Sequence, residues 1–447
     1  MTKILTIIVY ANYVKRGIFM RKVLSVFLVL VSLLFVVTMT SCDKEEGKVY
    51  YLNFKPEQND AWQRLATKYT ETTGVEVKVV TAAAGTYETT LTAELDKDDA
   101  PTLFQINGTV GYNAWKNYCL DLTDTDLHKE LTSNDFAVMN DGKVYGIAYV
   151  YEGFGIIVNK KLLKEAGYEI ADINSYTKLE AAAKAITANK DTLGFSAFTS
   201  AGLDGSSSWR FSGHLANMPL FYEFEEDKIT NQPATIKGTY LNEFKNIWDL
   251  YINNSTVPAS QLPSKTGTDT LAEFTTGKAV FYQNGTWEYS NVIAAGSVVK
   301  AEDLGYLPIY TGIRDSKQGL CCGTENYWSV NSQASKADQE ATLKFLHWVV
   351  TSEEGTTALA KDMGFVSPFK KAKAVDNVLC NIMNDYVAKG CYNVSWAFNH
   401  TPNVEAWRKG VVDALAAYSA DQTAPKWESV KTAFVSGWAS EYAKQNQ

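Results

Sequence analysis

Residues 49–79 read VYYLNFKPEQNDAWQRLATKYTETTGVEVKV, and this stretch predicts the fold class. The apolar run at 49–54 is typical of a buried strand, and the alternating valines at 75–79 are typical of another. Gly74 ends the segment between them, since glycine readily adopts a left-handed helix cap. Strand, helix and strand within about 30 residues predict a right-handed parallel unit. The helix is indicated by apolar residues at i, i+3, i+4 and i+7: Trp62, Leu65, Ala66 and Tyr69.

The alternation of strands and helices continues beyond this unit, so the predicted fold class is mixed α/β. In parallel sheets ligands bind beyond the carboxyl ends of strands, which makes the loop at 53–60 the first candidate binding segment. Ser335-Lys336-Ala337-Asp338 has the Ser-x-x-acid form of a capping box that starts a helix. Further strands are expected at 102–106, 144–151, 154–158 and 280–282, and helices at 175–190 and 336–350.

Composition and charge narrow the class of partner. The 447-residue chain has a formal net charge of −8, and its first 41 residues hold five basic and no acidic side chains. Removing those five basic charges leaves −13 for the 406 residues from 42 to 447. This length predicts two lobes of ordinary domain size. The excess of acidic residues argues against binding to nucleic acid and against electrostatic attraction to anionic lipid. We also expect the protein to be a monomer.

Residues 1–41 are expected to be a secretory signal peptide whose true start is Met20. Arg21 and Lys22 precede an apolar run of about 15 residues, shorter than the roughly 20 that span a bilayer. Cys42 follows small residues, which resembles the lipobox of bacterial lipoproteins and implies that Cys42 is acylated and becomes the mature N-terminus. The expected location is the outer face of the cytoplasmic membrane, or the periplasm where there are two membranes. An uncleaved anchor helix and a plain secreted protein are the alternatives.

Cysteine and histidine spacing predicts neither a metal site nor a cofactor. None of the cysteines has C-x-x-C spacing, and the four histidines are scattered without an i,i+4 pair. Cys380 and Cys391 are candidates for a disulfide in an exported protein, and free buried thiols are the alternative. The chain also lacks G-x-S-x-G, P-loop GK[ST] and H-E-x-x-H motifs, so no catalytic residue is assigned.

Three stretches resemble the extracellular solute-binding proteins of ABC importers, family 1, in particular the carbohydrate-binding group that includes maltose-binding protein. The first is DGKVYGI at 141–147 with GIIVNKKL at 155–162. The second and most distinctive is FTTGKAV at 274–280 followed by NGTW at 284–287. The third joins Ser335-Lys336 to GFVSP at 364–368. Cys321-Cys322-Gly323 stands where the family often has two glycines, which bears on the ligand more than on the fold.

The resemblance implies a two-lobed, periplasmic-binding-protein-like clamshell with hinge crossovers between α/β lobes. A tether at 42–47 would lead into a first lobe of 48–150 plus 304–350, and the second lobe would be 151–303 plus 351–447. Such proteins close on a ligand by a hinge motion and present it to the membrane permease subunits of the transporter. The expected function is therefore capture of an oligosaccharide, or another small polar solute, for import.

A sugar site needs flat aromatic faces and planar polar groups, which selects candidate tryptophans. Trp287 follows a strand end, and the resemblance implies that it stacks on sugar. Trp209 beside Arg210 suits a sugar or an anionic group. Trp396 and Trp407 lie where the family has further cleft aromatics. A structural core position is the alternative for each of these tryptophans.

Polar candidates come from the predicted strand ends and crossovers. Glu152 lies in the first crossover among aromatic residues, where sugar hydroxyls would satisfy a carboxylate that is costly to bury alone. Asn107 follows the third strand. The remaining candidates are in the loop at 53–60 and in the region of the departure from the family pattern: Lys55, Glu57, Gln58 and Tyr327.

Two other classes of function stay open. An extracellular glycoside hydrolase would need two carboxylates about 5–10 Å apart around the scissile bond, and no motif identifies such a pair. A sensor or adhesion protein would use the same clamshell without transport. Neighbouring genes for two permease subunits would favour import.

Overall fold

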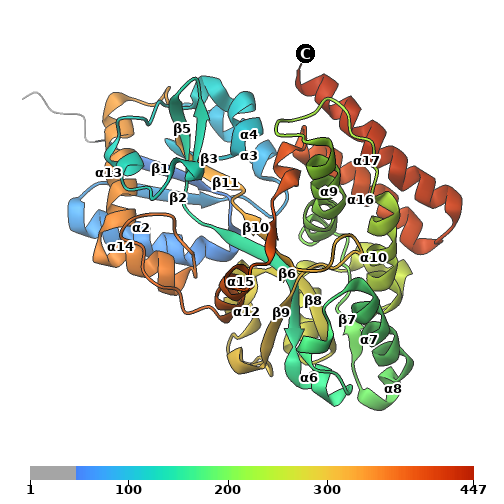
Figure 1. Cartoon of the computed structure of the whole chain (residues 1–447). Helices are drawn as coiled ribbons and strands as arrows, with labels where there is room; N and C mark the ends of the chain where they lie inside the picture. The colour runs from blue at the N-terminus through green and yellow to red at the C-terminus, as the bar shows by residue number, and fades with distance from the viewer. Residues whose placement is uncertain (1–46, 447) are drawn as a thin grey trace, which may run out of the picture. The chain divides into compact units, whose positions relative to one another are not determined.

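The computed structural model describes residues 47–446, and two β-sheets organise them (Figure 1). The predicted signal peptide and Cys42, together with all of the predicted tether except Gly47, lie outside the described residues. None of the helices within 47–446 combines the length and apolar composition of a bilayer span.

The first sheet contains the predicted parallel unit. Its strand order is β2-β1-β3-β11-β5-β4, with β1 parallel to both β2 and β3. Gly74 caps α2 with a φ of 79°, as the sequence predicts. Residues of β1 alternate between two hydrophobic clusters, Tyr51 facing one and Leu52 the other, which explains the unbroken apolar run. The strands are β1 (Val49–Asn53), β2 (Val77–Thr81), β3 (Leu103–Asn107), β4 (Ala137–Asn140), β5 (Lys143–Ala148) and β11 (Asn326–Val330).

The second sheet is built around β6, whose eight residues are all buried. Its order is β12-β10-β6-β8-β7, and β9 pairs with β6 off this path. Both β8 and β9 run antiparallel to β6. The strands are β6 (Glu152–Asn159), β7 (Ser196–Phe198), β8 (Ala279–Gly285), β9 (Leu304–Leu307), β10 (Gln318–Gly323) and β12 (Tyr392–Val394).

Helices cover the faces of both sheets (Figure 1). Ser335 caps α13 by accepting a hydrogen bond from the Asp338 amide, which confirms the predicted helix start. Around the first sheet lie α2 (Asn59–Thr73), α3 (Tyr87–Leu95), α4 (Gly108–Trp115), α5 (Asp126–Lys129), α13 (Lys336–Thr351) and α14 (Glu353–Thr357). Around the second lie α6 (Lys160–Glu165), α7 (Tyr176–Ala188), α8 (Lys190–Leu193), α9 (Asn217–Asp227), α10 (Leu241–Asn253), α11 (Gly267–Thr275), α12 (Tyr289–Val292), α15 (Val378–Ala388), α16 (Val404–Ala420) and α17 (Ala424–Gln445).

Sheet membership assigns two segments differently from the sequence-based lobe ranges. β9 and β10 both pair with β6, so 304–323 belongs with the second sheet and not with the first. Phe365 and Phe369 pack into the core beneath the first sheet, which places 353–369 there. We therefore propose a first lobe of 47–150 plus 324–370 and a second lobe of 151–323 plus 371–446. The chain then crosses between the lobes near 150, 324 and 370.

The possible disulfide between Cys380 and Cys391 is not formed. Both thiols are free. Cys380 is buried near the start of α15, and Cys391 lies beyond the end of the same helix. The Cys391 amide donates to the Tyr386 carbonyl, and the six helical residues from Cys380 to Tyr386 span roughly 9 Å, farther than a disulfide reaches.

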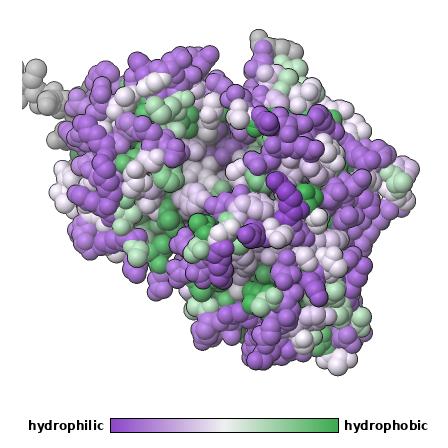
Figure 2. All heavy atoms as spheres, viewed as in Figure 1, coloured by the Kyte–Doolittle hydropathy of each residue, from purple (hydrophilic) through white to green (hydrophobic). Residues whose placement is uncertain are grey.

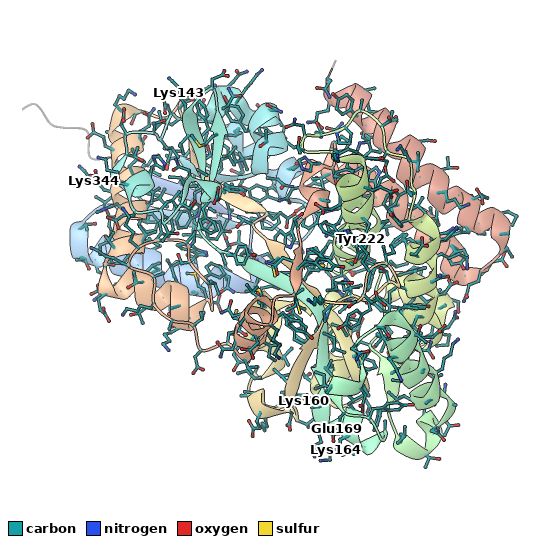
Figure 3. All side chains as sticks on the ribbon, in the orientation of Figure 1. Lys143, Lys160, Lys164, Glu169, Tyr222 and Lys344 are labelled. Atoms are coloured by element: carbon teal, nitrogen blue, oxygen red, sulfur yellow. The ribbon has the colours of Figure 1, made fainter. Side chains whose placement is uncertain are left out.

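Most charged side chains lie on the outside of the molecule. Figure 2 shows that hydrophilic residues cover most of one face. Figure 3 labels Lys164 and Glu169 at the far end of the second lobe, where their charged groups are 3.7 Å apart and exposed. Such exposed pairs contribute at most about 1 kcal/mol, so the fold depends on its cores.

We predict that Gly155→Ala destabilises the protein. A Cβ at position 155 in β6 would lie 2.5 Å from the Leu307 carbonyl oxygen and 2.7 Å from the Leu320 side chain. The free energy of unfolding should fall by about 1–3 kcal/mol, the usual cost of overpacking a core. Denaturant unfolding measures it. The control is Gly410→Ala on the exposed face of α16, which meets open space and should stabilise by up to about 1 kcal/mol. Equal stabilities of the two variants would contradict the packing described for β6.

Candidate functional site

A cavity of about 370 Å³ lies between the proposed lobes. It is bounded by the loop after β1, the start of α3, the 3-10 turn after β8 and the start of α16. The carboxyl end of β1 therefore contributes to it, as the parallel-sheet argument predicts. The residues singled out from the sequence that line this cavity are Lys55, Glu57, Asn107, Glu152, Trp209, Arg210, Trp287 and Trp396.

Three other candidates lie away from the cavity. The Gln58 side chain is buried and donates to the Met363 carbonyl at 3.2 Å. Tyr327 packs against the cluster around Ile106 in the first sheet. Trp407 faces α17, where its indole donates to the Phe434 carbonyl at 3.0 Å. We leave these residues out of the proposed site, because their side chains are used in packing.

A buried ion pair joins the loop after β1 to the start of β6. Lys55 Nζ lies 2.9 Å from both carboxylate oxygens of Glu152 and 3.7 Å from Glu57. Burial lowers the pKa of Lys55, but the two carboxylates outweigh it and hold that pKa above its ordinary value. From its sequence position Glu152 is expected to be satisfied by sugar hydroxyls. In the structure Lys55 does so.

Trp287 stands over the glycine that precedes it by two positions. A Cβ on Gly285 would lie 2.1 Å from the Trp287 ring, so a glycine is required beneath it. The ammonium of Lys55 is 5.6 Å from the ring centroid, within reach of a cation–π contact. This close approach gives a physical reason for the Asn-Gly-Thr-Trp sequence at 284–287. The turn holds the indole at the cavity wall.

An aromatic cluster surrounds Trp287. The ring centroid of Trp209 is 6.1 Å away and that of His214 is 5.2 Å away. His214 stacks on Phe154 at 4.1 Å, with 7° between the ring planes. Burial lowers the pKa of His214 well below its ordinary value, so its imidazole is neutral. Sequence reasoning missed His214, because a lone histidine carries no spacing signal.

Arg210 is turned into the protein and not toward a ligand anion. Its guanidinium donates to the Gln283 carbonyl, to Ser207 Oγ and to Thr270 Oγ1. The Gln283 amide in turn donates to the Arg210 carbonyl at 2.7 Å. Arg210 therefore ties the segment after Trp209 to β8, which positions the aromatic cluster.

The lobes also touch at the start of α3. Glu405 on α16 accepts from the Glu88 amide at 2.8 Å and from the Thr89 hydroxyl at 2.7 Å. A carboxylate at a helix N-terminus is a favourable partner for free amides. Nearby, Arg408 pairs with Glu325 at 3.4 Å. The sequence carried no signal for these contacts, because the partners are far apart along the chain.

A second cavity of about 320 Å³ adjoins the first. The two cavities share Glu88, Asn107, Trp115, Val404 and Glu405 among their lining residues. A ligand in the first cavity therefore has a polar neighbouring space into which a further unit can extend.

Glu288 is the half-buried carboxyl next to Trp287. Burial and the charge of Glu57 raise the pKa of Glu288 from its ordinary 4.5 to about 7. The Tyr282 hydroxyl contacts it at 3.4 Å. Glu288 also lines the cavity. Such a carboxyl can accept hydrogen bonds from a ligand.

Comparison with known proteins identifies relatives of this architecture. Residues 64–381 match the family described as bacterial extracellular solute-binding protein. The solute-binding protein RafE in complex with raffinose superimposes with a TM-score of 0.70 at 18% identity, covering 90% of this chain and all of RafE.

Two further structures are similar. A chitin oligosaccharide binding protein gives a TM-score of 0.69 at 18% identity, covering 89% of this chain and 98% of its own. A sugar transporter protein from Bacillus licheniformis in complex with stachyose gives 0.67 at 16% identity, covering 88% and 100%. At these identities the likeness shows that the fold is shared, and the fold is that of two-lobed solute-binding proteins.

We predict that Glu288→Gln stabilises the protein at alkaline pH. Between pH 4.5 and 7 the folded carboxyl holds a proton that the unfolded chain has released, so wild-type stability falls as the pH rises through this window. The amide of the variant does not titrate, so its free energy of unfolding does not fall in this way. The melting temperature of the variant should exceed that of wild type by a few degrees at pH 8 and match it near pH 4.5. The control is Glu302→Gln, an exposed carboxylate. Parallel pH profiles for Glu288→Gln and wild type would contradict the raised pKa.

Proposed function

The chain belongs to the family of bacterial extracellular solute-binding proteins, and we propose that it binds an oligosaccharide between its lobes for import by an ABC transporter. In this proposal the protein is a binding protein without catalytic turnover. Closure of the lobes hides the sugar and forms the face that the permease subunits recognise.

The single observation that carries the proposal is the combination of aromatic faces and planar polar groups in one cavity. Trp287 and Trp209 supply flat apolar surfaces, which suit the C–H face of a sugar ring. Glu57, Glu288 and Asn107 supply oxygens and an amide that suit vicinal hydroxyls. Ligand pockets combine apolar and aromatic surfaces with polar groups that fix the orientation of the ligand.

Two further observations support an oligosaccharide over a single sugar. The adjoining cavity extends the space beyond the first pocket. The similar structures also include complexes with raffinose and stachyose and a protein named for chitin oligosaccharide.

The same proposal places the protein on the outer face of the cell membrane. A lipid on Cys42 would hold the acidic body there, since each buried CH₂ contributes about 0.8 kcal/mol. Residues 43–46 would then serve as a short tether to the first lobe.

A thermal-shift screen against oligosaccharides tests the function, and Trp287→Ala tests the site. A ligand at 100 times its Kd should stabilise the protein by about 2.7 kcal/mol. Trp287→Ala should then weaken calorimetric affinity by about 1–3 kcal/mol, the scale for lost aromatic burial. Gly285→Ala should weaken it too, because the new Cβ displaces the ring.

The matched control is Trp348→Ala, a half-buried tryptophan that packs on Tyr69 in the first lobe and should leave affinity unchanged. A hit among amino acids or polyamines with silence for sugars would overturn the carbohydrate assignment. Turnover of a glycan would overturn the binding-protein assignment.

We predict that Cys42→Ala moves the protein from the membrane fraction to the soluble fraction, because the variant has no thiol to acylate. Fractionation of cells followed by immunoblotting measures this. Cys391→Ala removes a half-buried thiol near α15 and should leave the protein on the membrane. Retention of Cys42→Ala on the membrane would contradict the lipid anchor.

A further inference from the structure

The charged residues that line the cavity are mostly acidic. Six glutamates face it, namely Glu57, Glu88, Glu152, Glu288, Glu325 and Glu405. Three cationic side chains accompany them, Lys55, Arg210 and Arg408. A ligand in the cavity is therefore surrounded by more carboxyl groups than cationic groups.

Each of the three cations is already engaged within the protein. Lys55 is held by Glu152 and Glu57, and Arg408 by Glu325. Arg210 donates to a backbone carbonyl and to two hydroxyls, and its remaining Nε is covered by protein. An acidic group on a ligand therefore meets no cation whose charge is unbalanced, because Lys55 and Arg408 each already lie beside a carboxylate and Arg210 is enclosed by protein.

Two carboxyl groups, by contrast, have few donors of their own. Within residues 47–446 no hydrogen bond reaches the side chain of Glu88, and Glu288 is contacted by the Tyr282 hydroxyl at 3.4 Å and by the Asn291 side chain. Burial and the charge of Glu405 raise the pKa of Glu88 to about 7, and Glu288 is raised similarly by burial and Glu57. A partly buried carboxylate with few donors is unfavourable, and hydroxyl or ammonium donors from a ligand relieve that cost.

Glu88 and Glu288 also come from different lobes. Glu88 is in the first turn of α3 in the first lobe, and Glu288 is in the turn between β8 and α12 in the second. A ligand that bridges the lobes meets both carboxyl groups. A uronic acid in that position would add a negative charge between two others.

We infer that the cavity selects glycans that carry no acidic group, and that Glu88 and Glu288 impose this selection by accepting hydrogen bonds from hydroxyl or amino groups. The inference rests on the proposed carbohydrate function and specifies its substrate class. It predicts that the cavity binds uronic acids weakly, which does not follow from the fold.

Calorimetry at pH 8 and low salt tests the selection with probes matched in shape. Trigalacturonate and its methyl ester differ in charge at each ring, and chitotriose and the glucosamine trimer differ in their amino groups. We expect neutral or amino-bearing probes to bind, and the ester to bind at least tenfold more tightly than trigalacturonate. The double variant Glu88→Gln, Glu288→Gln should reduce the ratio of the Kd for trigalacturonate to the Kd for its ester. Glu288→Gln alone should reduce this ratio by a smaller factor.

The control is Glu225→Gln combined with Glu302→Gln, which removes the same charge from exposed positions and should leave the ratio unchanged. Trigalacturonate binding as tightly as its ester would overturn the selection while leaving the carbohydrate function intact. A ratio that the double variant does not alter would overturn the role of Glu88 and Glu288. Silence across probes of every charge would count against the carbohydrate function itself and, with it, the selection.

Discussion

The buried ion pair between Lys55 and Glu152 is the constraint on which the arrangement of the cavity depends. Two charges removed from water must be paired closely, because either one alone in the interior is strongly unfavourable. Lys55 follows β1 by two residues, and Glu152 is the first residue of β6. Their contact therefore holds the end of one sheet against the start of the other. It also holds an ammonium near the Trp287 ring.

Close contacts with two glycines allow the second sheet to position the aromatic cluster around Trp287. Gly155 lets β9 and β10 lie against β6, and Gly285 lets the Trp287 ring fold back over its own turn. Arg210 then ties β8 to the segment that bears Trp209. These contacts hold the indole rings of Trp287 and Trp209 on the side away from the cavity. The ring faces that line the cavity are therefore positioned without a ligand. Pre-organisation of this kind reduces the entropy that binding has to overcome.

The same cavity separates two kinds of polar group. Lys55 and Arg408 pair with carboxylates of the protein, and Arg210 donates to protein oxygens, so these cations act as structural elements. Glu88 and Glu288 have few donors, and their carboxyl groups remain available. Glu405 joins the proposed lobes at the helix start next to Glu88, so the contact between the lobes and the polarity of the cavity involve the same few residues.

The sequence alone determined the α/β class, the parallel unit at 49–79 and the candidates Trp287 and Glu57, because strand and helix periodicity and strand ends are local properties. It did not determine that Lys55 satisfies Glu152, that Trp407 packs on α17, or that 304–323 joins the second sheet. Glu405 and Glu88 are 317 positions apart, and no local pattern links them. Only the tertiary structure decided these points, because such pairs are selected by the packing of whole sheets and helices. The contact partners of these side chains therefore depend on the chain topology and not on the neighbouring residues in the sequence.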